Sequence, residues 1–152
     1  MLKHKIIERP AFTIVGMVYH SRDENDSIPA LWGRYLPREC EIDDVVERGV
    51  SYGLCLPAEE GDFRYVAGVE VKPGSSIPEG MVSVDIAAHR YVVVTHTGPV
   101  MEIANTFRVV NTQVLPDNGL EHDGKVDFER YDHRFRGPDN PQSEVDIYIS
   151  LA

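Results

Sequence analysis

Cysteines, long apolar runs and metal-ligand motifs are all scarce in this sequence. The two cysteines, Cys40 and Cys55, form no CxxC pair, so neither a disulfide framework nor a zinc site is indicated. The six histidines show no HxH or HExxH spacing. No segment reaches the roughly 20 apolar residues that span a bilayer, and residues 1–10 are too charged for a signal peptide. We therefore expect a cytoplasmic protein with no metal, no cofactor and no membrane contact.

Basic residues are also in short supply. The chain has 15 Lys and Arg residues against 25 Asp and Glu residues, which gives a formal net charge of −10. A surface that binds phosphates needs the opposite balance, so direct binding of nucleic acid is disfavoured. The same charge favours a cationic partner through long-range attraction, although an acidic surface also serves solubility alone.

The bulk composition fits one compact domain. With 152 residues, of which 42% are hydrophobic, the chain is long enough to bury a core and short for two domains. We therefore predict a single domain over residues 1–152.

Two segments have the apolar spacing of amphipathic helices. Ser27 is a candidate N-cap for the first, whose apolar residues recur at helical spacing: Ile28, Leu31, Trp32, Tyr35 and Leu36. Gly98-Pro99 opens the second, which we expect Pro116 and Gly119 to end; its apolar residues are Val100, Ile103, Ala104, Phe107 and Val114.

Elsewhere the apolar residues alternate with a period of two, as in strands. Residues 91–95 form a continuous run rich in valine, as expected of a central strand buried on both faces. The other expected strands lie at about 12–18, 52–56, 63–71, 126–135 and 144–151. The order strand, helix, strand, strand therefore occurs twice, in pseudo-repeats over about 9–72 and 88–152.

This order predicts an α+β fold made of duplicated strand-helix-strand-strand modules. Crossover connections would place two helices on one face of an antiparallel sheet. A central groove would follow the seam between the modules, where pockets usually form. The polar linker 73–80 is expected to close over one end of this groove.

Glu129 is the most informative candidate residue, in the run 127–132 with the sequence Asp-Phe-Glu-Arg-Tyr-Asp. Burying a carboxylate in an aromatic strand is unfavourable unless a cation or a hydrogen-bond donor meets it. Glu129 shares one face of its strand with Tyr131. Such a position suits a positively charged aromatic ligand. The alternative is a carboxylate that faces solvent or pairs with Arg130 or Arg134.

Aromatic residues in the expected elements are candidate walls around Glu129. Ring faces grouped around a carboxylate can hold an organic cation through cation–π attraction. The candidates are Trp32, Tyr52, Tyr65, Tyr91 and Tyr131. Taken one at a time, each is explained equally simply by packing in the core.

A second carboxylate, Glu70, lies in another apolar strand and supports a catalytic alternative. If Glu70 and Glu129 both entered the groove, they could act as an acid and base pair, because two neighbouring carboxylates push their pKa values apart. Such a pair would activate water against a strained electrophile such as a cyclopropane or an epoxide. The simpler interpretation of Glu70 is a residue on the solvent face of its strand.

Six short motifs follow one another along nearly the whole chain: Ile-Pro-Ala-Leu-Trp at 28–32, Tyr-Gly-Leu at 52–54, the strand 63–71, Tyr-Val-Val-Val-Thr-His-Thr-Gly-Pro at 91–99, Phe-Glu-Arg-Tyr-Asp at 128–132 and the strand 145–149. Taken in this order, they resemble the GyrI-like small-molecule-binding domain, which is the effector-binding domain of AraC-type and MerR-type multidrug regulators.

The resemblance implies a bacterial binding protein whose groove takes hydrophobic, often cationic, aromatic compounds. In regulators of this type a buried glutamate meets the positive charge of the drug, and Glu129 best matches that position. Some relatives are gyrase inhibitors, which makes a topoisomerase a possible partner, and others hydrolyse cyclopropane-bearing natural products. The sequence shows no helix-turn-helix before its first strand, so we expect a stand-alone form in which binding is favoured over enzymatic activity.

Overall fold

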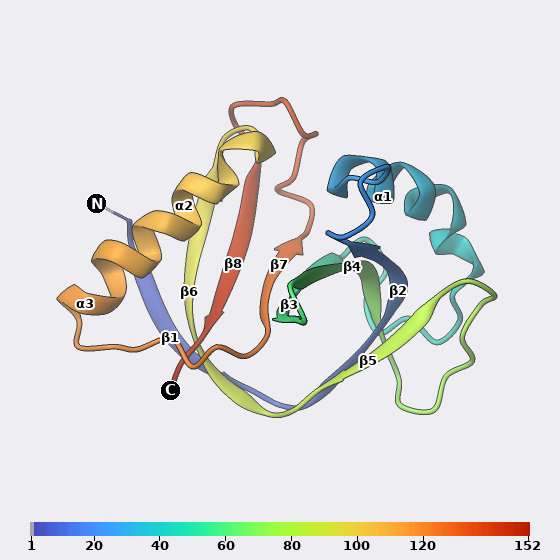
Figure 1. Cartoon of the computed structure of the whole chain (residues 1–152), viewed down its shortest axis with the longest axis horizontal. Helices are drawn as coiled ribbons and strands as arrows, with labels where there is room; N and C mark the ends of the chain where they lie inside the picture. The colour runs from blue at the N-terminus through green and yellow to red at the C-terminus, as the bar shows by residue number, and fades with distance from the viewer. Residues whose placement is uncertain (1) are drawn as a thin grey trace.

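Residues 2–152, the part of the chain that the computed structural model describes, form one sheet of eight antiparallel strands (Figure 1). Its strands are β1 (His4–Arg9), β2 (Phe12–His20), β3 (Ser51–Glu59), β4 (Asp62–Val71), β5 (Val82–Ile86), β6 (His89–Thr97), β7 (Asp127–Tyr131) and β8 (Glu144–Ser150). They lie in the order β1-β6-β8-β7-β3-β4-β2-β5, and all neighbouring pairs are antiparallel.

The strand order is symmetric about its centre. From one edge to the centre the order is β1-β6-β8-β7, and from the other edge it is β5-β2-β4-β3, the same order with each strand replaced by its counterpart in the other half of the chain. The equivalent strands β3 and β7 pair in the middle. The expected order strand, helix, strand, strand is present twice. An additional strand that the sequence pattern missed precedes each copy: β1 pairs with β6 and β5 pairs with β2, so each half lends an outer strand to the other (Figure 1).

The first expected helix is confirmed as α1 (Ile28–Tyr35). Ser27 is its N-cap, and the Ser27 hydroxyl accepts a hydrogen bond from the backbone N–H of Ala30 at 3.2 Å, which satisfies one of the free donors of the first turn. The chain continues as a 3₁₀ helix, η1 (Leu36–Glu41). Leu36 is 53% exposed, because the apolar stripe of α1 ends where the tighter helix begins.

The second expected helix is one helical run with changing pitch. It comprises η2 (Val100–Glu102), α2 (Ile103–Val109), the π-helical turn η3 (Val110–Val114) and α3 (Leu115–Asp117). Pro116 lies inside the run instead of ending it, because it falls at the start of α3, where a missing N–H is tolerated. Among residues 2–152, no helix combines the length and apolar character that crossing a membrane requires.

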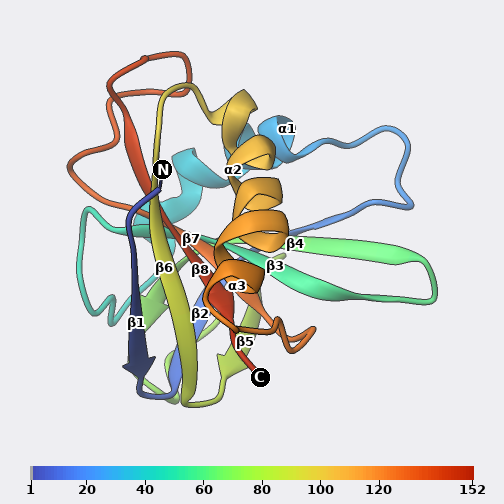
Figure 2. The same ribbon diagram turned by 90° about the vertical axis from the view of Figure 1, so that its left-hand side faces the viewer.

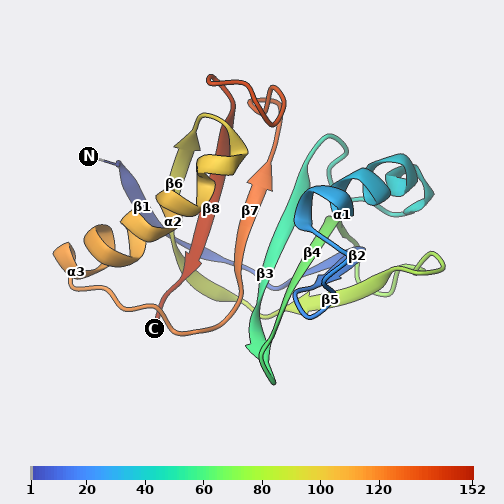
Figure 3. The same cartoon turned by 45° about the horizontal axis from the view of Figure 1, so that its top comes forward.

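Both helical runs pack on the same face of the sheet, as predicted (Figure 3). Beneath α1 lie apolar side chains of β2 and β4, among them Val15, Ala67 and Val69. Beneath the run from α2 to α3, which forms a single column in Figure 2, lie side chains of β6 and β8, among them Val92 and Ile147. Successive side chains of a strand point to opposite faces, and the opposite face carries a core rich in aromatic rings.

The linker 73–80 is held against η1 and the segment that follows it. Arg38 donates a hydrogen bond to the carbonyl of Glu79 at 2.7 Å, and the Ser75 hydroxyl lies 3.5 Å from the carboxylate of Asp44. None of the hydrogen bonds described for this linker reaches Glu129. The closure of the linker over one end of the groove therefore stays a prediction.

Candidate functional site

Glu129 lies at the centre of the sheet, where the two halves meet. It is paired with Gly53 across the β3–β7 ladder. Its neighbour Phe128 belongs to the aromatic core on the opposite face, so the Glu129 side chain points to the face that carries α1 and α2. Only 6% of Glu129 is exposed. The strand alternation seen in the sequence therefore places a buried carboxylate between the two helix-bearing halves.

Gly53 provides the space for this carboxylate. A Cβ atom at this position would lie 1.9 Å from the Tyr65 hydroxyl and 2.7 Å from Glu129 Oε1. Both distances are shorter than any van der Waals contact, so a side chain here would drive Tyr65 and Glu129 apart. The glycine is required by close approach of two side chains and not by an unusual backbone angle.

Two tyrosine hydroxyls meet Glu129 at a single oxygen. Tyr65 donates a hydrogen bond to Oε1 at 2.7 Å, and Tyr131 donates to the same oxygen at 2.8 Å. Trp32 on α1 extends the network, since its indole N–H donates to the Tyr65 hydroxyl at 3.2 Å. The structure thus brings together four of the predicted site residues: Glu129, Tyr65, Tyr131 and Trp32.

Burial dominates the electrostatics of this cluster. It raises the pKa of Glu129 above the ordinary glutamate value, and the hydrogen bonds from Tyr65 and Tyr131 oppose that rise. Burial and the nearby carboxylate also raise the pKa of both tyrosines, which keeps their hydroxyls protonated as donors. None of the ion pairs among residues 2–152 includes Glu129. A carboxylate without a cation is therefore held in an aromatic setting.

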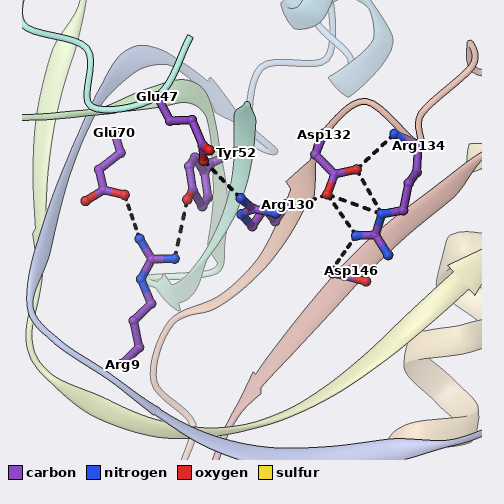
Figure 4. Close-up of polar contacts among 8 residues, drawn as sticks. All are labelled: Arg9, Glu47, Tyr52, Glu70, Arg130, Asp132, Arg134 and Asp146. Atoms are coloured by element: carbon purple, nitrogen blue, oxygen red, sulfur yellow. Dashed lines mark hydrogen bonds and ion pairs between the residues drawn. The ribbon is translucent and has the colours of Figure 1, made fainter. Parts of the chain in front are cut away.

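The arginines that follow Glu129 in sequence are engaged elsewhere. Arg130 contacts Glu47 and Asp132, each at 3.1 Å, and Arg134 pairs with Asp132 and with Asp146 (Figure 4). The alternative in which Arg130 or Arg134 neutralises Glu129 is therefore wrong.

Aromatic rings surround the Glu129 cluster on the helix-bearing face. The Trp32 ring centroid lies 5.4 Å from that of Tyr131 and 6.4 Å from that of Tyr65, both in edge-on geometry. Phe135, in the loop after β7, lies 5.0 Å from Tyr131. The sequence analysis missed Phe135, and the available signal was a lone aromatic residue in a polar loop close to Glu129.

Tyr52 and Tyr91 are not part of this cluster. Both belong to the aromatic core on the opposite face of the sheet, with ring centroids 5.9 Å and 5.2 Å from that of Phe128. Tyr52 precedes Gly53 on β3, so alternation turns it away from Glu129. The predicted cage of Tyr52, Tyr65 and Tyr91 around one carboxylate does not exist, because the prediction did not separate the two faces.

Glu70 also lies on that opposite face. Its carboxylate pairs with Arg9 at 2.8 Å (Figure 4). The Arg9 guanidinium carbon also lies 3.8 Å from the centre of the Phe12 ring. Arg9 further donates to the Tyr52 hydroxyl at 3.3 Å. Glu70 therefore has its own cation and does not form an acid and base pair with Glu129.

Two cavities of the structure lie away from Glu129. One of about 540 Å³ is lined by residues 8–10 and 88–90, and another of about 250 Å³ lies between Leu2, His4 and the end of the second helical run. Among residues 2–152, no three His, Cys, Asp or Glu side chains are grouped so as to hold a metal ion.

Comparison with known proteins connects this geometry to a family. Residues 5–151 match the family model described as Cass2, integron-associated effector binding protein. The transcriptional regulator BrlR of Pseudomonas aeruginosa is 47% identical over 147 residues, which cover 97% of this chain and 54% of BrlR. The chain thus spans about half the length of this curated relative.

Two solved structures share the fold at low sequence identity. SAV2435 bound to tetraphenylphosphonium matches with a TM-score of 0.77 and 16% identity, covering 99% of this chain and 94% of SAV2435. The integron cassette protein VCH_CASS2 from the mobile metagenome of Vibrio cholerae matches with a TM-score of 0.63 and 19% identity, covering 99% and 97% of the two chains. The predicted GyrI-like fold is confirmed, and the chain belongs to the Cass2 family of integron-associated effector-binding proteins.

Proposed function

We propose that this chain is a binding module for amphipathic, cationic aromatic compounds and that Glu129 supplies the counter-charge. The observation that carries the proposal is a 6%-exposed carboxylate that no cationic side chain among residues 2–152 neutralises. Burying such a group is unfavourable by several kcal/mol unless a partner compensates for the lost water. A ligand cation would provide that compensation.

The ring systems beside Glu129 support an aromatic ligand. Trp32, Tyr131 and Phe135 are each partly exposed, and the Tyr131 ring lies in edge-on contact with each of the other two. Their faces offer cation–π attraction and apolar contact to a flat, charged ring system.

The test compares a cationic and a neutral dye of similar shape, each titrated against wild type and Glu129→Gln. Loss of a charged hydrogen bond in a buried site weakens binding by about 1.5–3 kcal/mol, so we expect about a 10- to 100-fold loss for the cationic dye and little change for the neutral one. Glu70→Gln is the matched control, since it removes a carboxylate from the opposite face. Equal losses for both dyes would overturn the role of Glu129 as the counter-charge.

The sole tryptophan provides a signal from the protein itself. Trp32 contacts Tyr65 and Tyr131, so a ligand that reaches Glu129 should quench or shift the tryptophan emission.

Hydrolysis of strained electrophiles has less support, because Glu70 lies on the other face and is paired with Arg9. A topoisomerase partner stays a prediction from the net charge of −10 alone.

A further inference from the structure

When Glu129 is ionised, the hydrogen bonds around it have one direction. An indole N–H can only donate, so the Tyr65 hydroxyl accepts from Trp32 and must direct its own proton to Glu129 Oε1. The Tyr131 hydroxyl donates to the same oxygen. The polar donors that these three side chains bring to the site are therefore already used within the protein.

Acceptors, in contrast, remain free. Glu129 Oε2 accepts no hydrogen bond from residues 2–152, and the Tyr131 oxygen keeps lone pairs while its proton is engaged. The facing backbone at Gly53 is occupied by the β3–β7 ladder. Cys55, two residues along the same face of β3, has a pKa raised by burial and stays a thiol, which is a weak donor.

We infer that the site selects its ligands by a hydrogen-bond donor on the cation, and that it prefers a protonated nitrogen to a quaternary one. This inference rests on the proposed function and specifies the ligand class for it. A ligand N–H directed at Oε2 would satisfy the unpartnered oxygen and bring the charge to hydrogen-bond distance. A quaternary cation of the same shape brings the charge but leaves Oε2 without a donor.

The same arrangement disfavours two other kinds of ligand. A neutral compound that presents a carbonyl or ether oxygen to Oε2 would place two acceptors against each other. Tetraphenylphosphonium, the compound bound to SAV2435, carries no N–H. We expect this chain to bind phosphonium ions more weakly than protonated aromatic amines of comparable size.

A pair of matched dyes tests the inference. Acridine orange is protonated on its ring nitrogen at neutral pH, and in its 10-methyl derivative a methyl group replaces that proton on the same cationic ring system. Each dye is titrated by fluorescence anisotropy against wild type and against Glu129→Gln at pH 7. We expect wild type to bind the protonated dye at least about tenfold more tightly, the effect of one charge-assisted hydrogen bond.

Glu129→Gln shows whether the dye preference comes from a hydrogen bond to Oε2 or from the larger size of the 10-methyl dye. A methyl group that merely clashes would disfavour the 10-methyl dye equally in both proteins, whereas a preference set by Oε2 should shrink in Glu129→Gln. Equal affinity of wild type for the two dyes, with both weakened in Glu129→Gln, overturns the donor preference and leaves the counter-charge intact. If neither dye is affected by Glu129→Gln, the proposed function fails as well. If the variant does not fold, equal affinity of wild type for the two dyes still overturns the donor preference.

Discussion

Gly53→Ala is the sharpest test of how this site is built. The added Cβ would lie 1.9 Å from the Tyr65 hydroxyl, 2.6 Å from Tyr65 Cζ and 2.7 Å from Glu129 Oε1. Tyr65 is 2% exposed and its ring is rigid, so relief requires the hydroxyl and the carboxylate to separate. Overpacking a core costs about 1–3 kcal/mol, and losing a hydrogen bond to a charged group costs about 1.5–3 kcal/mol more.

The expected loss is therefore roughly 3–5 kcal/mol, which corresponds to a fall in Tm of roughly 6–20 °C for a domain of this size. Thermal unfolding followed by circular dichroism measures it. Gly33→Ala on α1 is the matched control: its Cβ would meet nothing within 4 Å, so we expect a gain of about 0.5–1 kcal/mol from helix propensity. If Gly53→Ala melted within about 2 °C of wild type, the argument that Gly53 is needed for the Tyr65–Glu129 contact would be refuted.

Three further predictions follow from the same structure. Because the pKa of Glu129 is raised in the folded state, the folded protein retains this proton to higher pH than the unfolded chain. As pH rises above the ordinary glutamate pKa, wild type should lose stability relative to Glu129→Gln by up to about 1.4 kcal/mol per pH unit. Parallel curves of Tm against pH for the two proteins would contradict this. Ser27→Ala removes the cap of α1 and should cost about 1 kcal/mol, with Ser27→Asp close to wild type in urea unfolding. Arg9→Met leaves Glu70 without its cation and should cost roughly 1–3 kcal/mol, while dye affinity at Glu129 stays unchanged; a large change in affinity would place the ligand on the other face.

The sequence predicted the elements of the fold better than the composition of the site. Alternation and helical spacing located β2, β3, β4, β6, β7 and β8 and both helical runs. The edge strands β1 and β5 were both missed. In β1 the two apolar residues, Ile6 and Ile7, are adjacent and flanked by charged residues, so no period of two appears. β5 does alternate, with Val82, Val84 and Ile86 on one face, and this signal was overlooked. Their partners belong to the other half of the chain, and pairing over that distance leaves no local pattern.

The site was predicted only in part. The sequence shows which residues of one strand share a face, but it does not show how neighbouring strands and helices pack against that strand. The period of two correctly placed Glu129 and Tyr131 on one face. Whether Tyr65, Tyr52 or Tyr91 joins them depends on how β3, β4 and β6 line up with β7, and a shift of one residue reverses each face. Gly53 held the missing information, since a glycine opposite Glu129 indicates that another side chain must approach there.

The two faces of the sheet offer a comparison within one molecule. On one face, the Arg9 guanidinium lies 3.8 Å from the Phe12 ring centre and 2.8 Å from a Glu70 oxygen. On the other face, Glu129 has aromatic neighbours and tyrosine donors but no cation among residues 2–152. The first assembly is a complete set of ring, carboxylate and cation, and its cation is an N–H donor. The second lacks only that component, and this difference is the strongest physical reason to expect that a ligand supplies it.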